Sequence, residues 1–465
     1  MKAVKKMKKP NKIQTILSVA SCKLTRAVLR KTGRGGTALP GTVAMKICKN
    51  VLSVPAKDME IVVVTGTNGK TTTCNMIEHV LTEAGHDCHR DKSGANLLHG
   101  ITSDLLCDTD WLGRPKNHYA VLEVDEAALK QVVPLIRPKA IVVTNLFTDQ
   151  ADRFGNVDNT RREIQKGIMR SPGSVLVLNA DETQSAALGL DVPNKVIWYG
   201  FEKSVGQQGE VKLSDAGKCP KCGSDYEYDY HTYAHLGGFH CPGCGYKRHD
   251  PDVAVTSIDR TDTNGSTFRL STDGKTQEVY VSLPAVYNVY NSAACIGAIK
   301  AMGLPVSEAV QGLSNVKSAF GRMETFHLGD NVLQMILVKN PAGCNQAFTY
   351  VTSFKDDFNA VLCLNNRTGD GHDISWIEDT DYEMLCSDPH LQKLYVCGDR
   401  AQDLYDRLVK AGADESRMEL VTDYAKLVDE LEEEKCTTFL LPNYTAMMEL
   451  RTALAPKAGN KEFWE

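Results

Sequence analysis

The sequence lacks any long run of apolar residues. No apolar stretch in its 465 residues approaches the ~18 that a membrane-spanning helix needs. The first residues, MKAVKKMKKPNK, lack the apolar core and the small-residue cleavage site of a secretory signal. We therefore expect a cytoplasmic protein, and at this length one with two or three domains that each have a core.

Acidic residues are absent from residues 1–57, which contain fourteen Lys or Arg; the first acid is Asp58. The net charge of the whole chain is only -5, so the basic excess is local. Two interpretations of this basic segment stay open. It is an arm whose amphipathic helix, near KIQTILSVASCKLTRAVLRK, packs on the next domain, or it is a face attracted to anionic lipid or a polyphosphate substrate.

The sequence also lacks a phosphate-binding loop of the usual spacing. Such a loop has four residues between its first glycine and the Gly-Lys-Ser/Thr end, which would need a glycine where Val64 stands. Instead, VVVTGTNGKTTT places Gly66 and Gly69 two residues apart. A β-rich apolar run precedes this turn and a helical pattern follows it as far as Gly85. Strand, turn and helix together predict a compact phosphate-binding loop.

The residue types of this loop suit a nucleotide. Amides at a helix start attract phosphate, and glycine lets the backbone come close. Lys70 is expected to neutralise phosphate charge during catalysis, and Thr71 to offer its hydroxyl to magnesium. The loop residues expected to bind nucleotide are Gly66, Thr67, Asn68, Gly69, Lys70, Thr71 and Thr72.

Two further predicted strands end in polar residues. They lie within HYAVLEVDEAAL (118–129) and PKAIVVTNLFTDQADRFG (138–155). Ligands of open α/β sheets bind at the carboxyl ends of strands. Glu123 ends the first strand and suits magnesium; the second strand is followed by Thr144, Asn145, Asp149 and Asp152.

Fifteen cysteines are expected to be reduced thiols and metal ligands in an intracellular protein, rather than disulfides. Two Cys-Pro-x-Cys-Gly knuckles, separated by eighteen residues, contain Cys219, Cys222, Cys241 and Cys244. This spacing predicts a zinc ribbon over residues 216–250. Because four thiolates leave no position for water, we expect a structural site. The nearby histidines are expected to be solvated loop residues: His231, His235 and His240.

Zinc ribbons also occur in nucleic-acid-binding proteins, which is one alternative function. The tyrosines of this ribbon, such as Tyr228, alternate with acids such as Glu227 and Asp229. These acids would repel phosphate. We therefore expect no nucleic-acid partner.

GTNGKTTT, TNLFTDQADRFG and LPAVYNVYNSAAC (283–295) resemble the central ATPase domain of Mur ligases and folylpolyglutamate synthases. Those enzymes phosphorylate a carboxylate with ATP, and an amine then displaces the phosphate. The resemblance implies that Glu123 makes a second magnesium contact and that Arg322 reaches phosphate. It places Asn145, Asn288 and Asn291 at the nucleotide. The sequence departs from many Mur ligases at Asp149-Gln150, where they have Asp-His.

The expected fold is α/β, with a Mur-ligase-type central ATP-binding domain over residues 58–320 that carries the phosphate loop and the inserted four-cysteine zinc ribbon. After Arg322, segments such as AVLCLNNRTGDGHDISWIED and TTFLLPNYTAMMELRTAL each read as a strand leading to a loop or helix. They predict a smaller, Rossmann-like α/β domain over residues 321–465.

NPAGCNQAF and DGHDISWIEDTDYE resemble the last domain of the MurT family, the Mur-ligase-like subunits of lipid II isoglutaminyl synthase. The ribbon and GRGGTALPG (33–41) agree with this, and the Asp-Asn-Pro-Arg segment with which some Mur ligases select an amino acid is missing. The resemblance implies ATP-dependent amidation of the D-glutamate α-carboxylate in lipid II, through an acyl phosphate. The alternative is a stand-alone ligase of the Mur or folylpolyglutamate type that adds an amino acid.

In that family, ammonia comes from a separate glutamine amidotransferase subunit, and an aspartate of the ligase subunit completes its Cys-His pair. The sequence contains no local signature of a glutamine-hydrolysing cysteine. The matching segment is GDGHDISW (369–376). We favour Asp373, since a rigid strand following it would hold it at an interface, over Asp370, which is typical of a turn.

Overall fold

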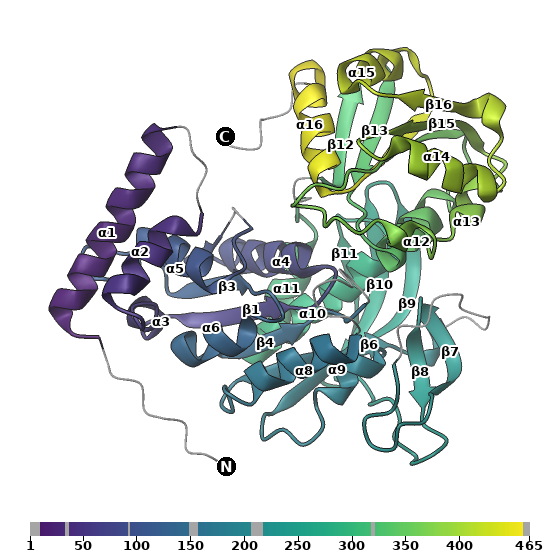
Figure 1. Ribbon diagram of the computed structural model, residues 1–465. Helices are drawn as coiled ribbons and strands as arrows, with labels where there is room; N and C mark the ends of the chain where they lie inside the picture. The colour runs from purple at the N-terminus through teal and green to yellow at the C-terminus, as the bar shows by residue number, and fades with distance from the viewer. Residues whose placement is uncertain are drawn as a thin grey trace. The chain divides into compact units, whose positions relative to one another are not determined.

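The computed structural model describes residues 10–32, 37–91, 94–147, 157–205, 217–317 and 321–458. They form two compact units, coloured purple to teal and green to yellow in Figure 1. Unit 1 contains the described residues up to Val316, apart from Phe147, and unit 2 contains those from Lys317 onward. Among the helices of these residues, none is both long and apolar enough to cross a membrane.

Unit 1 is built on a nine-stranded sheet of order β11-β10-β9-β6-β5-β4-β1-β3-β2, in which the seven strands from β9 to β2 are parallel. Its first half contains α1 (Lys12–Lys31), α2 (Leu39–Ile47), α3 (Ser53–Ala56), β1 (Glu60–Thr65), α4 (Lys70–Glu83), β2 (Cys88–Arg90), α5 (Leu98–Cys107), β3 (Tyr119–Glu123), α6 (Leu129–Ile136), β4 (Ala140–Val143) and α8 (Val157–Ile168). The remaining elements are β5 (Val175–Asn179), α9 (Thr183–Ala187), β6 (Val196–Phe201), η1 (Lys203–Val205), β7 (Glu227–Tyr233), β8 (Leu236–His240), β9 (Val253–Asp262), β10 (Gly265–Thr272), β11 (Lys275–Val281), α10 (Val286–Met302) and α11 (Val306–Leu313).

Helices cover both faces of this sheet. The central strand β1 is buried from Ile61 to Thr65, as expected for an apolar strand in a parallel sheet. Ile61 and Val63 pack in a core with α5, α6 and α8. On the other side, α4 and α10 contact one another and the strands (Figure 1). The layers bring the carboxyl ends of β1, β3 and β4 to one edge, where the phosphate loop lies.

The first two helices, α1 and α2, pack against α5. Their small core contains Val19 and Cys22 of α1, Ala44 of α2 and Leu106 of α5. The basic segment therefore includes a helix that packs on the rest of unit 1, as the first interpretation of its charge expected.

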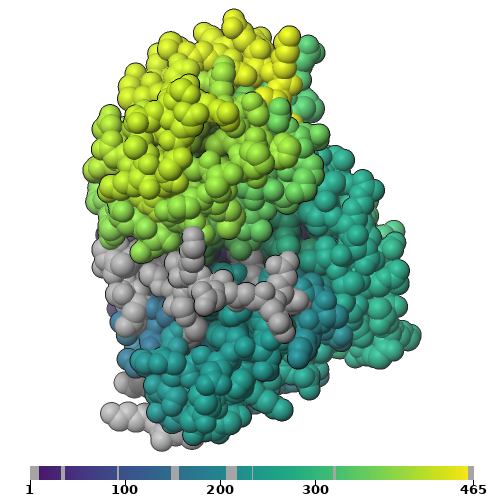
Figure 2. Space-filling model, turned by 90° about the vertical axis from the view of Figure 1, so that its right-hand side faces the viewer, coloured from purple at the N-terminus to yellow at the C-terminus, as the bar shows by residue number. Residues whose placement is uncertain are grey.

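The ribbon hairpin β7-β8 is inserted between β6 and β9 and forms its own two-stranded antiparallel sheet. Beyond it, β9, β10 and β11 form the antiparallel end of the large sheet. The teal residues of this region form most of the face of unit 1 that Figure 2 shows.

Unit 2 has a six-stranded sheet of order β12-β13-β17-β14-β15-β16, parallel except for β12. Its elements are β12 (Arg322–Leu328), β13 (Asn331–Ile336), α12 (Pro341–Val351), β14 (Phe358–Cys363), η2 (Ser375–Ile377), α13 (Tyr382–Cys386), β15 (Leu391–Cys397), α14 (Ala401–Lys410), η3 (Glu415–Arg417), β16 (Met418–Val421), α15 (Tyr424–Glu433), β17 (Thr437–Pro442) and α16 (Tyr444–Ala458).

This second sheet is also covered on both faces. Leu440 of β17 packs in a core with α15 and α16, whereas its neighbour Phe439 contacts the ring of Tyr350 on α12. The chain leaves β14 toward α13, which contacts α12, and leaves β17 toward α16. The segments that follow the adjacent parallel strands β14 and β17 therefore lie on opposite faces of the sheet. Open α/β sheets bind ligands at the carboxyl ends of two such strands.

Candidate functional site

The loop between β1 and α4 can be formed only with glycine at two positions. Gly66 has φ 124° and Gly69 has φ 81°, both unfavourable for other residues. A Cβ atom at Gly66 would lie 2.4 Å from Thr144 Oγ1, and one at Gly69 would lie 2.4 Å from Asn291 Oδ1. The two-residue spacing noted in the sequence therefore makes a tight turn that packs directly against β4 and α10.

Asn145, which follows β4, holds this loop from the neighbouring strand. Its backbone oxygen accepts a hydrogen bond from Thr67 N at 2.8 Å, and its Oδ1 accepts one from Asn68 N at 2.9 Å. Its Nδ2 donates to Asn68 O at 3.2 Å. The structure thus gives Asn145 a role in shaping the loop, whereas the sequence predicted a contact with the nucleotide.

Lys70 begins α4 and turns its ammonium group back over the loop. Lys70 Nζ donates to the carbonyls of Gly66 and Thr67 and to Glu126 Oε1, which lies 3.2 Å away. The Lys70 and Glu126 side chains are only 12% and 9% exposed. Burial weakens screening by water, so this ion pair is a strong local interaction. Glu126 was not expected from the sequence, although it lies only three residues after Glu123.

Thr71 and Glu123 meet beside Lys70. Thr71 Oγ1 donates to Glu123 Oε2 at 2.6 Å, and Asn96 Nδ2 donates to the other carboxylate oxygen at 3.5 Å. Magnesium prefers hard oxygen ligands, and neighbouring oxygens in its octahedral shell lie about 2.9 Å apart. A hydroxyl and a carboxylate at this separation fit two adjacent ligands of that ion.

Two buried asparagines of α10 support the loop from behind. Asn291 Oδ1 accepts a hydrogen bond from Thr73 Oγ1 at 3.3 Å, and Asn291 Nδ2 donates to Asn288 Oδ1 at 3.2 Å. Asn288 Nδ2 donates in turn to Pro284 O at 2.6 Å. Asn291 also lies against Gly69. This network joins the predicted residues of α10 to α4, and Thr73 is a further member that the sequence did not indicate.

The structure does not test some of the predicted residues. Asp149, Gln150 and Asp152 lie outside the described residues. Arg322 belongs to unit 2, where it begins β12 opposite Ile336 of β13. Its predicted contact with phosphate stays a prediction.

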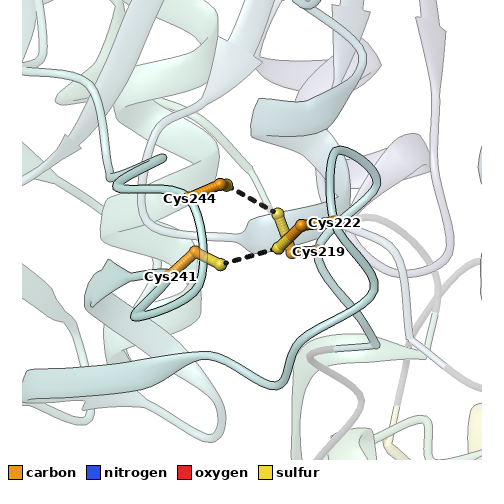
Figure 3. Close-up of side chains that lie close together, drawn as sticks. All are labelled: Cys219, Cys222, Cys241 and Cys244. Carbon is orange, nitrogen blue, oxygen red and sulfur yellow. Dashed lines mark hydrogen bonds between the residues drawn. The ribbon is translucent and has the colours of Figure 1, made fainter.

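The four knuckle cysteines converge on one point (Figure 3). Their sulfur atoms all lie within 4.8 Å of one another, with Cys219 and Cys244 3.6 Å apart and Cys222 and Cys241 3.3 Å apart. Thiolates bound to one zinc ion lie about 3.8 Å apart, since each Zn–S bond is about 2.3 Å. The soft, tetrahedrally grouped donors therefore fit zinc.

The two knuckles share one backbone design. Cys219 O accepts from Gly223 N at 2.8 Å, and Cys241 O accepts from Gly245 N at 2.9 Å. Gly223 and Gly245 have φ values of 80° and 72°. Both turns end in the left-handed region, which explains why a glycine follows each Cys-Pro-x-Cys sequence.

A buried ionic network attaches the ribbon to the core of unit 1. Asp181 Oδ1 accepts from Arg248 Nε at 2.6 Å, and Asp181 Oδ2 accepts from the Tyr290 hydroxyl at 2.7 Å. Arg248 Nη2 also donates to Phe201 O at 2.6 Å. Burial raises the pKa of the Asp181 carboxyl, and Arg248 and Tyr290 oppose that rise.

The expectation for the three ribbon histidines was wrong in one respect. His231 and His240 lie on strands β7 and β8, and the ring of His231 stacks on Tyr228. His235 is buried in the turn between the strands, with Nε2 3.6 Å from Glu182 Oε1. His235 therefore lies in the interior, beside Glu182 of unit 1, whereas the sequence placed it in solvent.

Unit 2 has a pocket where β13, β14 and β17 end. Two hydrogen bonds join its walls: Asn365 N donates to Asn443 Oδ1 at 3.1 Å, and Asn443 Nδ2 donates to Asn365 O at 2.6 Å. These two asparagines begin the loops that diverge from β14 and β17. The pocket is lined by Lys339, Asn365, Gly369, Asp370, Gly371, Asp373, Ile374, Trp376, Asn443 and Tyr444.

The two predicted aspartates both line this pocket but differ in their contacts. Asp370 accepts hydrogen bonds from Thr445 N at 2.8 Å and from the Thr445 hydroxyl, and it lies in a turn, as expected. Asp373 is exposed, and its Oδ1 accepts from Ser375 N at 2.8 Å. That hydrogen bond lowers the pKa of the Asp373 carboxyl. The strand expected after Asp373 was wrong: a 3₁₀ turn, Ser375–Ile377, follows.

Comparison with known proteins identifies the family of the whole chain. The Mur ligase middle domain matches residues 64–240, and the MurT ligase C-terminal domain matches residues 337–447. The chain is 34% identical to the lipid II isoglutaminyl synthase (glutamine-hydrolysing) subunit MurT of Streptococcus pneumoniae R6, over 96% of this chain and 98% of that protein. It is 32% identical to the subunit of the same name from Staphylococcus aureus N315, over 91% and 94% of the two chains.

Solved structures agree on the fold. The MurF ligase of Thermotoga maritima in complex with ADP superposes with a TM-score of 0.63 at 13% identity, over 90% of this chain and 84% of that one. At this identity the match establishes the architecture alone. Together with the two family models and the full-length relatives, it shows that this chain belongs to the MurT family and is an ATP-dependent ligase of the Mur type.

Proposed function

We propose that this chain is the ligase subunit of a lipid II isoglutaminyl synthase, which uses ATP to convert the D-glutamate α-carboxylate of the stem peptide to D-isoglutamine in the cytoplasm. The observation that carries the proposal is the meeting of Lys70, Thr71 and Glu123 at one compact loop, in a chain that matches MurT subunits from end to end. The loop residues suit the activation of a carboxylate by ATP. The relationship to MurT subunits indicates which substrate carries that carboxylate.

The charges around the loop suit phosphoryl transfer. The first-turn amides of α4 and the Lys70 ammonium face the position where phosphate oxygens would lie, and they offset the negative charge of a triphosphate. Thr71 and Glu123 would hold magnesium, which when bound neutralises charge on the β- and γ-phosphates. Glu126 and the loop carbonyls hold Lys70 until phosphate offers it stronger acceptors.

The activated intermediate would be an acyl phosphate. A carboxylate oxygen of the substrate attacks the γ-phosphorus and ADP leaves; ammonia then attacks the carbonyl carbon and phosphate leaves with that oxygen. Positioning and electrostatics account for most of the catalysis of the first step. The four ribbon thiolates leave no ligand position for water on zinc, so the ribbon contributes stability rather than a catalytic metal.

Ammonia would come from a glutamine amidotransferase subunit that forms a heterodimer with this chain. The exposed Asp373, whose carboxylate accepts a hydrogen bond from Ser375 N at the pocket wall, suits the third member of a Cys-His-Asp arrangement completed across an interface. Asp370 is engaged with Thr445 and suits a structural role in the same pocket. Asp373 is therefore the preferred residue for this contact.

The proposal is tested by mixing the chain with its amidotransferase, ATP, glutamine and lipid II, and weighing the product. A product lighter than lipid II by the difference between a hydroxyl and an amino group supports it. A product heavier by an amino-acid residue, formed without the second subunit, would instead identify a stand-alone ligase.

A further inference from the structure

Helix α1 carries its apolar stripe on the outside. Ile13, Leu17, Leu24 and Val28 are 71%, 53%, 68% and 52% exposed. At about 100° per residue, their spacing of four, seven and four residues puts them within an arc of about 60°. A surface helix of a globular protein normally turns such a stripe inward, so α1 is oriented the wrong way for a core helix.

The inward face of α1 is made of small and polar residues instead. Thr15, Ser18, Val19 and Cys22 are buried against the rest of unit 1. Ser18 Oγ donates to Ala44 O of α2 at 3.1 Å, and Cys22 Sγ donates to Ser103 O of α5 at 3.7 Å. These hydrogen bonds fix the rotation of the helix, so the outward stripe is a consequence of specific packing.

Basic residues border one edge of the stripe. Lys12, Lys23 and Arg30 lie along that edge, and no acid occurs anywhere in residues 1–57. The Lys23 ammonium lies 5.1 Å from the ring centroid of Trp111, whose side chain is 63% exposed. The nearest acid on that turn is Asp110, whose Oδ1 accepts from Leu112 N and Arg114 N, each at 2.8 Å.

Exposed apolar side chains are concentrated in this part of the described chain. Nine of its fifteen large exposed hydrophobic residues lie between residues 13 and 112, although that span is less than a quarter of the sequence. They are Ile13, Leu17, Leu24, Val28, Leu39, Ile47, Leu97, Trp111 and Leu112. Large exposed apolar patches mark interaction sites, and the four of these residues that belong to α1 share one face of that helix.

We propose that α1 lies in the plane of an anionic lipid surface. The apolar stripe would enter the acyl-chain boundary, and Lys12 and Arg30 would meet phosphate headgroups. An apolar face edged by Lys and Arg is typical of interfacial helices, and tryptophan favours the same depth. Nucleic acid would contact the basic residues of α1 but leave its apolar stripe in water, whereas an anionic bilayer would contact both the basic residues and the stripe.

This contact would bring the loop of unit 1 to a lipid-anchored substrate. That consequence rests on the proposed function, whereas the membrane contact itself rests only on the faces of α1.

The test is flotation of the full chain, in complex with its amidotransferase, on vesicles of phosphatidylcholine with and without phosphatidylglycerol. We expect binding to the anionic vesicles, weakened by salt. The double variant Leu17→Ser/Leu24→Ser should bind at least about tenfold more weakly, because burying each methylene favours binding several-fold. Lys12→Glu/Arg30→Glu should weaken binding to anionic vesicles by a similar factor.

A matched control replaces exposed apolar residues of unit 2. Val409→Ser/Leu420→Ser removes side chains that are 37% and 42% exposed and should leave flotation unchanged. Absence of binding to anionic vesicles, or equal binding by the stripe variant and the parent, would overturn the proposal. So would loss of the amidotransferase from the stripe variant, or its change from dimer to monomer, since the stripe would then be a protein interface.

Amidation of a water-soluble lipid II analogue separates this inference from the proposed function. The stripe variant should keep the parent rate on that analogue and lose activity only on lipid II embedded in vesicles. Normal flotation with no amidation of either acceptor would contradict the proposed function and leave the membrane contact standing.

Discussion

The loop of unit 1 and the pocket of unit 2 occupy equivalent places, each where neighbouring parallel strands end, yet they are built differently. At the loop, the Lys70 and Glu126 side chains are largely buried and make an ion pair. At the pocket, Asp373 is exposed, and the hydrogen bond that fixes it comes from its own turn. The first site contains a buried pair of opposite charges, whereas the second presents an exposed carboxylate on the wall of a pocket.

This difference suggests a division of chemistry. Charge-rich phosphoryl transfer benefits from a buried site in which electrostatic interactions are strong. An aspartate that orients the histidine of another chain must instead be reachable from outside. Amidation supported by glutamine should need both sites, whereas amidation supported by ammonium salts should need only the loop. Comparing amidation rates with glutamine and with ammonium therefore distinguishes the role of the loop from the role of the pocket.

The largest effect is expected for Lys70→Ala. Removing the ammonium takes away charge stabilisation of the transferring phosphoryl group, and rates should fall by about 10³-fold or more with glutamine and with ammonium alike. Steady-state amidation with each nitrogen source measures this, and co-purification should show intact binding of the amidotransferase. Lys57→Ala is the matched control, since that side chain is 78% exposed and pairs only at the surface. Normal turnover by the Lys70 variant would show that the loop takes no part in the reaction.

A selective effect is expected for Asp373→Asn. Glutamine-dependent amidation should fall by on the order of 10²-fold or more, because the partner histidine loses its orienting charge, while the rate with ammonium stays at the parent level. Asp370→Asn is the comparison: it replaces the oxygen that accepts from the Thr445 hydroxyl, which should lower the stability of unit 2 without favouring either nitrogen source. Equal loss with both sources for the Asp373 variant would end its assignment to the triad.

Removal of zinc is expected to lower the stability of unit 1 without favouring amidation from either nitrogen source. Cys219→Ser should lose the metal and destabilise unit 1 by several kcal/mol, which lowers the melting temperature by roughly 5–10 °C. Metal analysis and thermal unfolding measure the two effects. Cys436→Ser, at a thiol outside the cluster, should change neither. A full complement of zinc in the Cys219 variant would contradict the four-thiolate site.

The smallest effect is expected for His89, an ionisable residue of unit 1 that is not part of the loop. Burial lowers the pKa of His89, but its hydrogen bonds to Asp104 and Asp108 outweigh this and raise the pKa above 6.5. The imidazolium therefore stabilises the fold fully below about pH 6.5, and this contribution is lost as the pH rises through the raised value.

His89→Gln should accordingly be more destabilising in acid than in alkali. Urea unfolding at about pH 6 and about pH 9 measures the difference. The surface pair of His390 and Asp357 in unit 2 supplies the control, since exposed pairs contribute little and His390→Gln should change stability little at either pH. A His89 variant that is equally destabilised at both values would show that the buried charge is not the cause.

The sequence predicted the loop well because its mechanism is local. The positive φ values of Gly66 and Gly69 and the start of α4 at Lys70 all lie within one short segment. The four cysteines were also predictable, since each knuckle is fixed by its own turn. The segment LFTDQADRFG, however, lies largely outside the described residues and adds nothing to this comparison.

Contacts between distant segments were harder to predict. Glu126 pairs with Lys70 only because β1 and β3 are neighbours, and Thr73 meets Asn291 across more than two hundred residues. In unit 2, the strand pattern did not distinguish the turn after Asp373 from a strand, because Ile374, Trp376 and Ile377 have side chains typical of strands in a segment set by tertiary packing. The edge strand β16 was missed for a related reason, since only its last residue is buried.

The central claim, that the loop of unit 1 makes a carboxyl group reactive by transferring phosphate to it, has one direct test. The complex is given lipid II whose D-glutamate α-carboxylate carries oxygen-18, together with ATP and ammonium, and the phosphate released is analysed by mass spectrometry. If the carboxylate attacks the γ-phosphorus, each phosphate formed with an amide should carry one labelled oxygen, and the Lys70 variant should release none. Amide formed together with unlabelled phosphate would contradict the account.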